Sequence, residues 1–213
     1  MTAAMANPGG RGRPAAASPD QVLTAARRQL LAGQRVDVRA IAAELGLGRA
    51  TIYRWFGSRD GLLGELLVSE FQAMLHAAET HDHRASANRV LDALDGFIRR
   101  LAGSDAFRRF LEQEPAALQL LTSGHGPVQP KIVAAVQDLI TRAVHDDGYA
   151  PPVEPPTLAY ALVRLSEAFL YTDTVVGFHV EVDRLREVQA ALLGVPDQAR
   201  RPRRRLREAG RRA

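Results

Sequence analysis

The sequence predicts an all-α fold in which an N-terminal unit of three short helices precedes a larger helical body. Apolar residues recur at spacings of three and four through most of the 213-residue chain, as they do in amphipathic helices. Ser, Asp, Gly and Pro stand where helices would begin and end, and no alternating strand pattern or internal repeat is found. With 46% apolar and 24% charged residues, the chain is long and apolar enough to bury a core without cross-links.

Three short helices are expected before residue 57. Ser18 is followed by Pro at the first helical position and by Gln21, which completes a capping box, and Gly33 ends this helix. Asp37 caps the second helix, which ends at the Gly46–Gly48 run. The third helix is expected over 49–56, with its aromatic pair, Trp55 and Phe56, packed in the core rather than on a ligand.

The body continues the helical pattern. Ser58 caps a long fourth helix that ends near 80–84, and residues 123–130 and 148–156 are expected to be loops. Further helices are predicted at 90–101, after Ser104, after Pro115, over 132–144, over 157–174 and over 182–193. The helix over 157–174 is apolar nearly all round, which predicts that it is buried.

Several classes of protein are excluded by composition and motif. There is no cysteine, which excludes disulfides, thiolate metal sites and cysteine nucleophiles. The H-E-x-x-H, G-x-G-x-x-G, P-loop and G-x-S-x-G motifs are absent, so we expect no enzyme, no cofactor and no metal site. The start has no apolar signal segment and no run approaches ~18 apolar residues, so a cytoplasmic protein without membrane contact is expected.

Charge is segregated along the chain. Residues 1–56 carry eight Arg against three acidic residues, and residues 197–213 carry eight Arg against two. Residues 71–196 carry a net charge of −5. Basic ends on an acidic body are typical of a nucleic-acid-binding module joined to another domain.

A helix-turn-helix pattern coincides with the basic N-terminal unit. Where its two helices cross, the first needs a small residue, the turn needs a residue that tolerates the left-handed backbone region, and the second helix needs a branched apolar anchor. Ala42, Gly46 and Ile52 supply these residues at the right spacing. The alternative interpretation is a helical hairpin whose small residues only permit close packing.

The run from Val36 to Leu67 resembles the DNA-binding domain of TetR/AcrR-type transcriptional regulators. The matching residues are Val38, Arg39, Ile41, Ala42, Gly46, Gly48, Arg49, Ala50, Thr51, Ile52, Tyr53, Trp55, Phe56, Arg59, Asp60 and Leu62. Gly48 departs from the family's usual Ser or Thr, so the third helix lacks a side-chain cap. The later R-x-S-E-x-F-L-Y run at 164–171 also resembles a QsdR-like subgroup, whose members are linked to lactone sensing.

The resemblance implies a homodimeric repressor that binds a palindromic double-stranded DNA operator and is released by a small apolar or weakly polar effector. The third helix then enters the major groove, where its residues and those at the starts of neighbouring helices meet bases and phosphates. The DNA-binding residues expected on this basis are Arg39, Arg49, Ala50, Thr51, Tyr53, Arg54 and Arg59.

The two ends of the chain are expected to be disordered, as a basic arm over 1–17 and an Arg-rich tail over 197–213. The arm holds Arg11-Gly12-Arg13-Pro14, the core of a minor-groove hook, so Arg11 and Arg13 are further candidate DNA contacts. A plain basic arm and a solvated tail are the alternatives. Between the ends we expect a DNA-binding domain over 18–60 and a C-terminal ligand-binding and dimerisation domain over 61–196.

A polar stripe marks the 157–174 helix. Tyr160, Arg164, Glu167 and Tyr171 fall within an arc of about 60°, and the other faces are largely apolar. The stripe is interpreted as a structural ion pair, as a polar stripe in the dimer interface, or as the polar wall of a ligand pocket. The apolar wall of such a pocket is expected from Phe71, Met74, Leu75, Phe97, Phe110, Leu118 and Leu121.

A dimer is expected because one short recognition helix reads too few bases alone. The resemblance implies a four-helix dimer interface, for which the helices over 132–144 and 157–174 are the candidates. A different class of function stays open at this stage. A constitutive architectural protein would use the basic arm and tail without any inducer, and would bind with strong salt dependence and little sequence preference.

Overall fold

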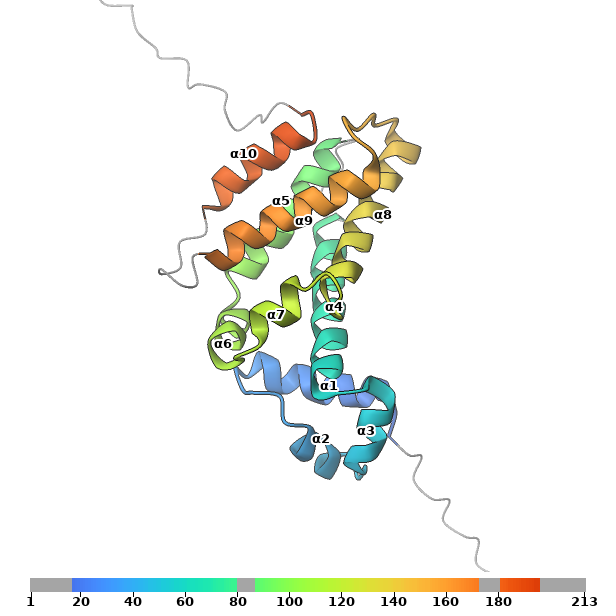
Figure 1. Cartoon of the computed structure of the whole chain (residues 1–213), viewed down its shortest axis with the longest axis vertical. Helices are drawn as coiled ribbons and strands as arrows, with labels where there is room; N and C mark the ends of the chain where they lie inside the picture. The colour runs from blue at the N-terminus through green and yellow to red at the C-terminus, as the bar shows by residue number, and fades with distance from the viewer. Residues whose placement is uncertain (1–16, 80–86, 173–180, 196–213) are drawn as a thin grey trace, which may run out of the picture.

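The computed structural model describes residues 17–79, 87–172 and 181–195, and within these ranges it contains α-helices and no strand. Three N-terminal helices form one end of an elongated molecule, and the long helix α4 (Arg59–Glu79) leads from them into the helical body (Figure 1). The predicted all-α fold is confirmed.

The N-terminal unit consists of α1 (Pro19–Leu31), α2 (Val38–Glu44) and α3 (Arg49–Phe56), and the predicted bounds of α3 are confirmed. The capping box is also confirmed, because the Gln21 side chain accepts from the Ser18 N–H at 2.8 Å while Ser18 Oγ accepts from the Gln21 N–H at 3.4 Å. Asp37 caps α2 by accepting the Arg39 N–H at 2.7 Å.

The crossing of α2 and α3 has the packing that the helix-turn-helix pattern predicts. Ile41 and Ile52 are fully buried, and Ala42 is 4% exposed. Gly46 follows α2 with a φ of +64°, in the left-handed region that favours glycine. Gly48 precedes α3 and provides no side-chain hydrogen bond to its first turn.

Seven helices follow the N-terminal unit in the described part of the chain. After α4 come α5 (Ala87–Ala102), α6 (Asp105–Gln113), α7 (Ala117–Thr122), α8 (Gln129–Asp147), α9 (Pro155–Thr172) and α10 (Val182–Leu192). In Figure 1, α8 and α9 form one side of the body, and α6 and α7 lie between the body and the N-terminal unit. No described helix is long and apolar enough to cross a bilayer.

The expected starts of three helices were wrong. Pro115 precedes α7 instead of opening it, whereas α8 starts at Gln129 and α9 at Pro155, inside the expected loops. Proline suits the first turn of a helix, where its missing N–H has no intrahelical partner, and Pro130 and Pro155 lie in the first turns of α8 and α9.

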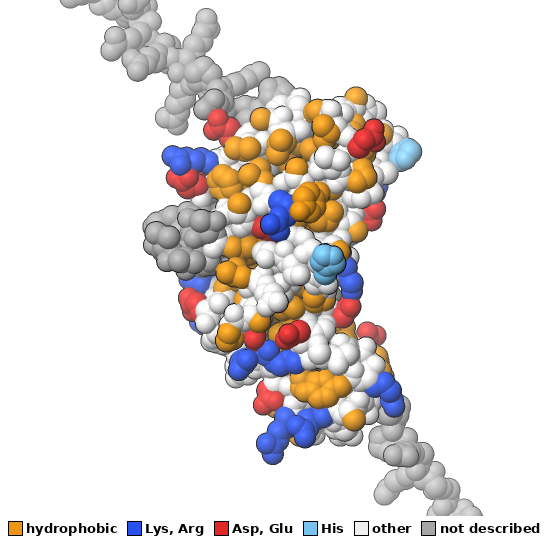
Figure 2. Space-filling view, viewed as in Figure 1, with side chains coloured by type: hydrophobic (Ala, Val, Ile, Leu, Met, Phe, Trp, Pro, Cys, Tyr) orange, Lys and Arg blue, Asp and Glu red, His pale blue; other side chains and the backbone are white. Residues whose placement is uncertain are grey.

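The expectation that the 157–174 helix is buried all round was also wrong, because α9 has an exposed face. Thr157, Tyr160, Arg164 and Ala168 lie on an exposed face at helical spacing. Hydrophobic side chains are spread over the side of the molecule that α8 and α9 form (Figure 2).

Candidate functional site

The outer surface of α3 carries polar side chains above an apolar anchor. Arg49, Ala50 and Arg54 are exposed, and Tyr53 is 41% exposed. Thr51 is half-buried beside the fully buried Ile52. Because Ile52 fixes the helix on the core from below, the side chains that precede and follow it are presented outwards.

Trp55 and Phe56 are half-buried and pack against the core, which confirms their predicted place.

A basic groove of about 460 Å³ runs beside α3, across the start of α2. Its lining residues are Arg35, Val36, Asp37, Val38, Arg39, Arg49, Tyr53 and Arg59. The only acid among them, Asp37, is occupied in capping α2. On the face drawn in Figure 2, basic side chains gather at the end formed by the N-terminal helices. The groove is therefore suited to an anion.

Arg59, expected as a phosphate contact at the start of the fourth helix, also has two partners within the protein. Its Nη2 donates to Glu114 Oε2 at 2.6 Å and its Nε donates to the Val36 carbonyl at 3.1 Å. Glu114 belongs to the end of α6 and is 7% exposed. The hydrogen bond from Arg59 keeps the pKa of Glu114 below its ordinary value. This pairing was not expected because the two residues are 55 positions apart in sequence.

A small cavity of about 50 Å³ lies between α4, α5, α8, α9 and the end of α7. Its apolar lining consists of Phe71, Leu75, Leu94, Phe97, Leu101, Leu121, Val128, Ile132, Ala135, Val136, Val163 and Leu170. Its polar lining consists of Gln129, Ser166, Glu167 and Tyr171. Six residues expected around a pocket therefore line one cavity, namely Phe71, Leu75, Phe97, Leu121, Glu167 and Tyr171.

Five other residues expected around the pocket do not line it. Leu118 and Tyr160 are 44% and 54% exposed, because α7 and α9 turn these positions to the surface. Met74 is half-buried on α4 and does not line the cavity, and Phe110 stacks on Phe107, which in turn contacts the wall residues Phe71 and Tyr171. Arg164 reaches the polar end of the cavity from the exposed side of α9.

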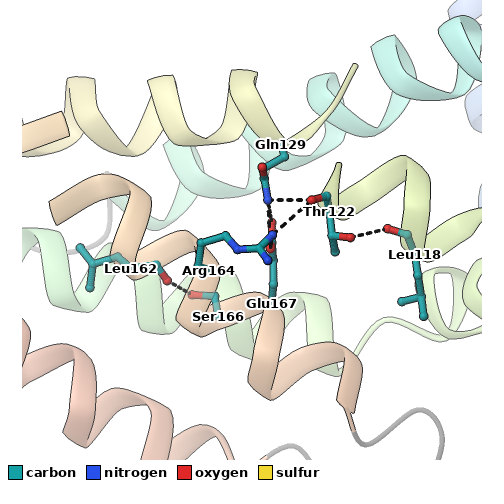
Figure 3. Close-up of polar contacts among 7 residues, drawn as sticks. All are labelled: Leu118, Thr122, Gln129, Leu162, Arg164, Ser166 and Glu167. Atoms are coloured by element: carbon teal, nitrogen blue, oxygen red, sulfur yellow. Dashed lines mark hydrogen bonds and ion pairs between the residues drawn. The ribbon is translucent and has the colours of Figure 1, made fainter. Parts of the chain in front are cut away.

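A hydrogen-bonded cluster forms that polar end (Figure 3). Gln129 Nε2 donates to both carboxylate oxygens of Glu167, at 2.9 and 3.1 Å, and to the Thr122 carbonyl at 3.0 Å. Arg164 Nη1 donates to Glu167 Oε2 at 2.8 Å and to the same carbonyl at 3.2 Å. Gln129 was missed because its Gln-Pro pair was interpreted as a loop, although Pro in a first helical turn is the signal that would have placed it.

Burial has the same effect on both titratable groups of the cavity. It raises the pKa of the Glu167 carboxyl, against the lowering effects of Gln129 and Arg164. It also raises the pKa of the Tyr171 phenol, with a further contribution from the charge of Glu167. Tyr171 therefore stays a neutral hydroxyl, and the cavity offers few polar groups in an apolar wall.

Arg11 and Arg13, as well as the tail over 197–213, lie outside the described residues. The expectations about the two ends of the chain are therefore untested.

Two family profiles match the chain. The profile described as "Bacterial regulatory proteins, tetR family" matches residues 22–66, and the profile described as "Tetracyclin repressor-like, C-terminal domain" matches residues 85–194. The first contains α3 and the second contains most of the cavity wall. The comparison with curated proteins gave no match.

Solved structures of similar architecture belong to transcriptional regulators. The R. erythropolis transcriptional repressor QsdR from the TetR family is 26% identical, with a TM-score of 0.75, over 83% of this chain and 94% of that one. A TetR transcriptional regulator from Rhodococcus sp. RHA1 is 20% identical, with a TM-score of 0.56, over 82% and 94%. The TetR family repressor AlkX from Dietzia sp. strain DQ12-45-1b shares the fold at 22% identity, with a TM-score of 0.53, over 81% and 96%.

The C-terminal profile alone covers more than half of the chain, and the N-terminal profile coincides with the helix-turn-helix. The chain therefore belongs to the TetR family of bacterial regulatory proteins and is a DNA-binding transcriptional regulator rather than an enzyme.

Proposed function

We propose that the chain is a homodimeric repressor that a small molecule releases from a palindromic operator. The observation that carries the proposal is the apolar cavity with one polar end, in a body that is joined to the DNA-binding end by α4 and α6. The similarity to QsdR, which is described as a transcriptional repressor, supports the direction of regulation.

On DNA, α3 enters the major groove of each half-site. Arg49, Ala50 and Thr51 meet base edges, because they occupy the first turn of the recognition helix. Tyr53 and Arg54 lie further along, where the helix approaches the backbone. Phosphates bind in the basic groove beside Arg39 and Arg59, helped by the helix N-termini that open onto it.

The basic arm adds contacts in the minor groove through Arg11 and Arg13. Deletion of residues 1–16 then lowers the slope of log affinity against log salt by about 0.9 for each phosphate that the protein no longer neutralises. It also abolishes any preference for A·T pairs flanking the site. An unchanged slope and flank preference would remove the arm from the interface.

The dimer forms through α8 and α9. The exposed face of α9, with Tyr160 and Ala168, is covered by the partner copy in this arrangement. Ala168→Glu places a charge on that face and should convert the dimer to a monomer in sedimentation experiments. Glu154→Ala, an exposed change just before α9, is the control and should leave the dimer intact. A dimer that survives Ala168→Glu would contradict this interface.

The effector is apolar or weakly polar and uncharged. Because the Glu167 carboxylate is hydrogen-bonded by Gln129 and paired with Arg164, the polar end is close to neutral, and Arg164 does not offer an unpaired positive charge to an acid. A lactone or an acyl chain ending in a neutral group fits this description. Ligand pockets usually measure about 300–1,000 Å³, so a ligand of that size must push the walls of the cavity apart.

A matched pair of probes tests the ligand proposal. γ-Decalactone should raise the melting temperature of the full chain and weaken its binding to DNA, whereas decanoic acid should do neither. Glu167→Gln removes the negative charge and keeps the shape, so it should admit the acid. Equal responses to both probes in the natural chain would contradict the discrimination against acids. No response to any neutral probe in a broader series of lactones and esters would contradict the proposal that a neutral small molecule releases the protein from DNA.

A further inference from the structure

The end of α6 touches the DNA-binding unit at several points. The Gln113 side chain donates to the Gly33 carbonyl at 3.1 Å, at the end of α1. The next residue, Glu114, accepts from Arg59 Nη2 at 2.6 Å and from Arg35 Nε at 3.4 Å. A helix of the body therefore ends against the connection between α1 and α2 and against the start of α4.

Glu114 is a buried carboxylate whose two cationic partners both line the basic groove. A buried charge is stable only when it is paired and hydrogen-bonded, and both partners come from the DNA-binding unit. The packing of the body on this unit is thus tied to the side chains that face DNA. Glu112, two residues earlier on the same helix, is exposed and makes a natural comparison.

The guanidinium of Arg59 is held from two sides. Its Nε bonds the Val36 carbonyl, and its Nη2 bonds Glu114. Because a guanidinium has five N–H groups on a rigid plane, fixing two of them sets the direction of the others. Arg59 is therefore oriented along the groove wall beside Arg39 and Arg49.

We propose that Glu114 is an interdomain latch that positions Arg59 and Arg35 for the DNA phosphate. It does not touch DNA in this arrangement. It acts by holding the two guanidiniums, and with them the start of α4, in the orientation that a phosphate in the groove requires. The latch requires only that the chain binds DNA. Its test is therefore independent of whether an inducer exists and of which molecule it is.

The latch is also joined to the cavity wall by packed aromatic rings. The Phe107 ring of α6 lies 5.9 Å from that of Phe71 and 6.4 Å from that of Tyr171, between ring centroids, and both partners line the cavity. Phe107 stacks on Phe110 at 6.3 Å, and the Glu114 N–H donates to the Phe110 carbonyl at 3.0 Å. A change in the wall therefore has a continuous packed route to the latch.

The test is a double-substitution cycle on DNA binding. The probe is a fluorescent duplex of about 40 base pairs carrying the site selected by the full chain from a random pool. Glu114→Gln keeps the shape and removes the charge, and should lower affinity about tenfold and lower the salt slope, since fewer phosphates are neutralised. In an Arg59→Gln background the same substitution should have little further effect, because its partner is already absent.

Controls separate the latch from general stability. Glu112→Gln makes the same chemical change on the same helix and should leave affinity and slope unchanged. Circular dichroism melts establish that each variant is folded at the binding temperature, and Glu114→Asp, which keeps the charge and shortens the reach, serves if Glu114→Gln does not fold. Glu114→Asp should then lower affinity by a smaller factor. An affinity that is unchanged or raised, or an equal loss in both Arg59 backgrounds, would overturn the latch.

Discussion

The two ends of this molecule are built on different principles. The DNA-reading end is assembled from helices adjacent in sequence, and its anchor residues Ala42, Gly46 and Ile52 lie within one short run. The cavity end draws its wall from residues between Phe71 and Tyr171, carried by five helices. A local motif can thus be recognised in one dimension, whereas a cavity is a property of how distant helices pack.

The same contrast separates two glutamates, of which Glu114 is buried and Glu167 is partly buried. Glu114 faces the DNA-binding unit with two arginines, and pairing with Arg59 lowers its pKa. Glu167 faces the cavity, and burial raises its pKa although Arg164 lies within 2.8 Å. The charge of Glu114 therefore stabilises the packing of the body on the DNA-binding unit, whereas the charge of Glu167 is destabilised by its burial beside the cavity.

Truncation of the α3 anchor should give the largest effect. Ile52→Ala leaves a void under the recognition helix and should lower the free energy of unfolding by about 2–5 kcal/mol. Val163→Ala, at an existing cavity, enlarges a space that is already open and should cost less. Chemical denaturation measures the loss in free energy of unfolding for each variant. A larger loss for Val163→Ala than for Ile52→Ala would contradict the view that the α3 anchor is packed more tightly than the cavity wall.

Changes on the outer face of α3 come next. Arg49→Ala and Tyr53→Ala should each weaken specific DNA binding about tenfold or more, as expected when a side chain that touches a base or phosphate is removed, with helicity unchanged. Arg100→Ala, an exposed substitution of the same charge on α5, is the control and should bind normally. If both α3 variants match the natural chain in fluorescence anisotropy titrations, α3 is not the reading helix.

The cavity hydroxyl should give a smaller effect. Tyr171→Phe removes one polar group from the cavity. It should make the binding free energy of a neutral probe such as γ-decalactone less favourable by about 0.5–1.5 kcal/mol. Tyr160→Phe makes the same change on the exposed face of α9 and should leave probe affinity unchanged. Calorimetric titration compares the two variants. Equal losses would show that the probe does not bind in the cavity.

The two glutamates should respond to pH in opposite directions. The lowered pKa of Glu114 means that its contribution to stability is present above the ordinary value of 4.5 and is lost as pH falls through the folded-state pKa. The raised pKa of Glu167 means that its contribution is present below 4.5 and is lost as pH rises through its folded-state pKa. Relative to the natural chain, Glu114→Gln should therefore lose the most folding stability near neutral pH. Glu167→Gln should become more stable relative to the natural chain as pH rises. Unfolding curves from acid to neutral pH that run parallel for all three proteins would contradict this assignment.

Capping of α3 should give the smallest effect. Gly48→Ser supplies the missing side-chain acceptor at an extended backbone position with open space around it, and should raise the free energy of unfolding by a few tenths of a kcal/mol. Thermal melts measure this change. Gly46→Ala, measured beside it, is the comparison of opposite sign, because it strains a left-handed turn and should be destabilising. A destabilised Gly48→Ser would mean that the cap position serves another role.

Sequence alone predicted the parts of this molecule that depend on neighbouring residues. The caps at Ser18 and Asp37 and the bounds of α3 follow from local chemistry. Whether Tyr160 or Tyr171 faces inwards does not follow from local chemistry, because both lie on one arc of α9. Which part of the arc is covered depends on how the other helices pack, and the ring that meets Tyr171 is Phe107 of α6. The partnership of Glu114 with Arg59 likewise depends on where α6 ends in space.

Selection of bound DNA from a random pool tests the central claim most directly, because it requires no knowledge of the operator or the inducer. The full chain should enrich a motif with two inverted half-sites, centred about 10–10.5 base pairs or a multiple of that apart. Arg49→Ala should lose the motif while keeping weaker, salt-sensitive binding. A pool that stays random after selection, or one enriched equally by Arg49→Ala, would contradict reading by α3 and favour an architectural DNA-binding protein instead.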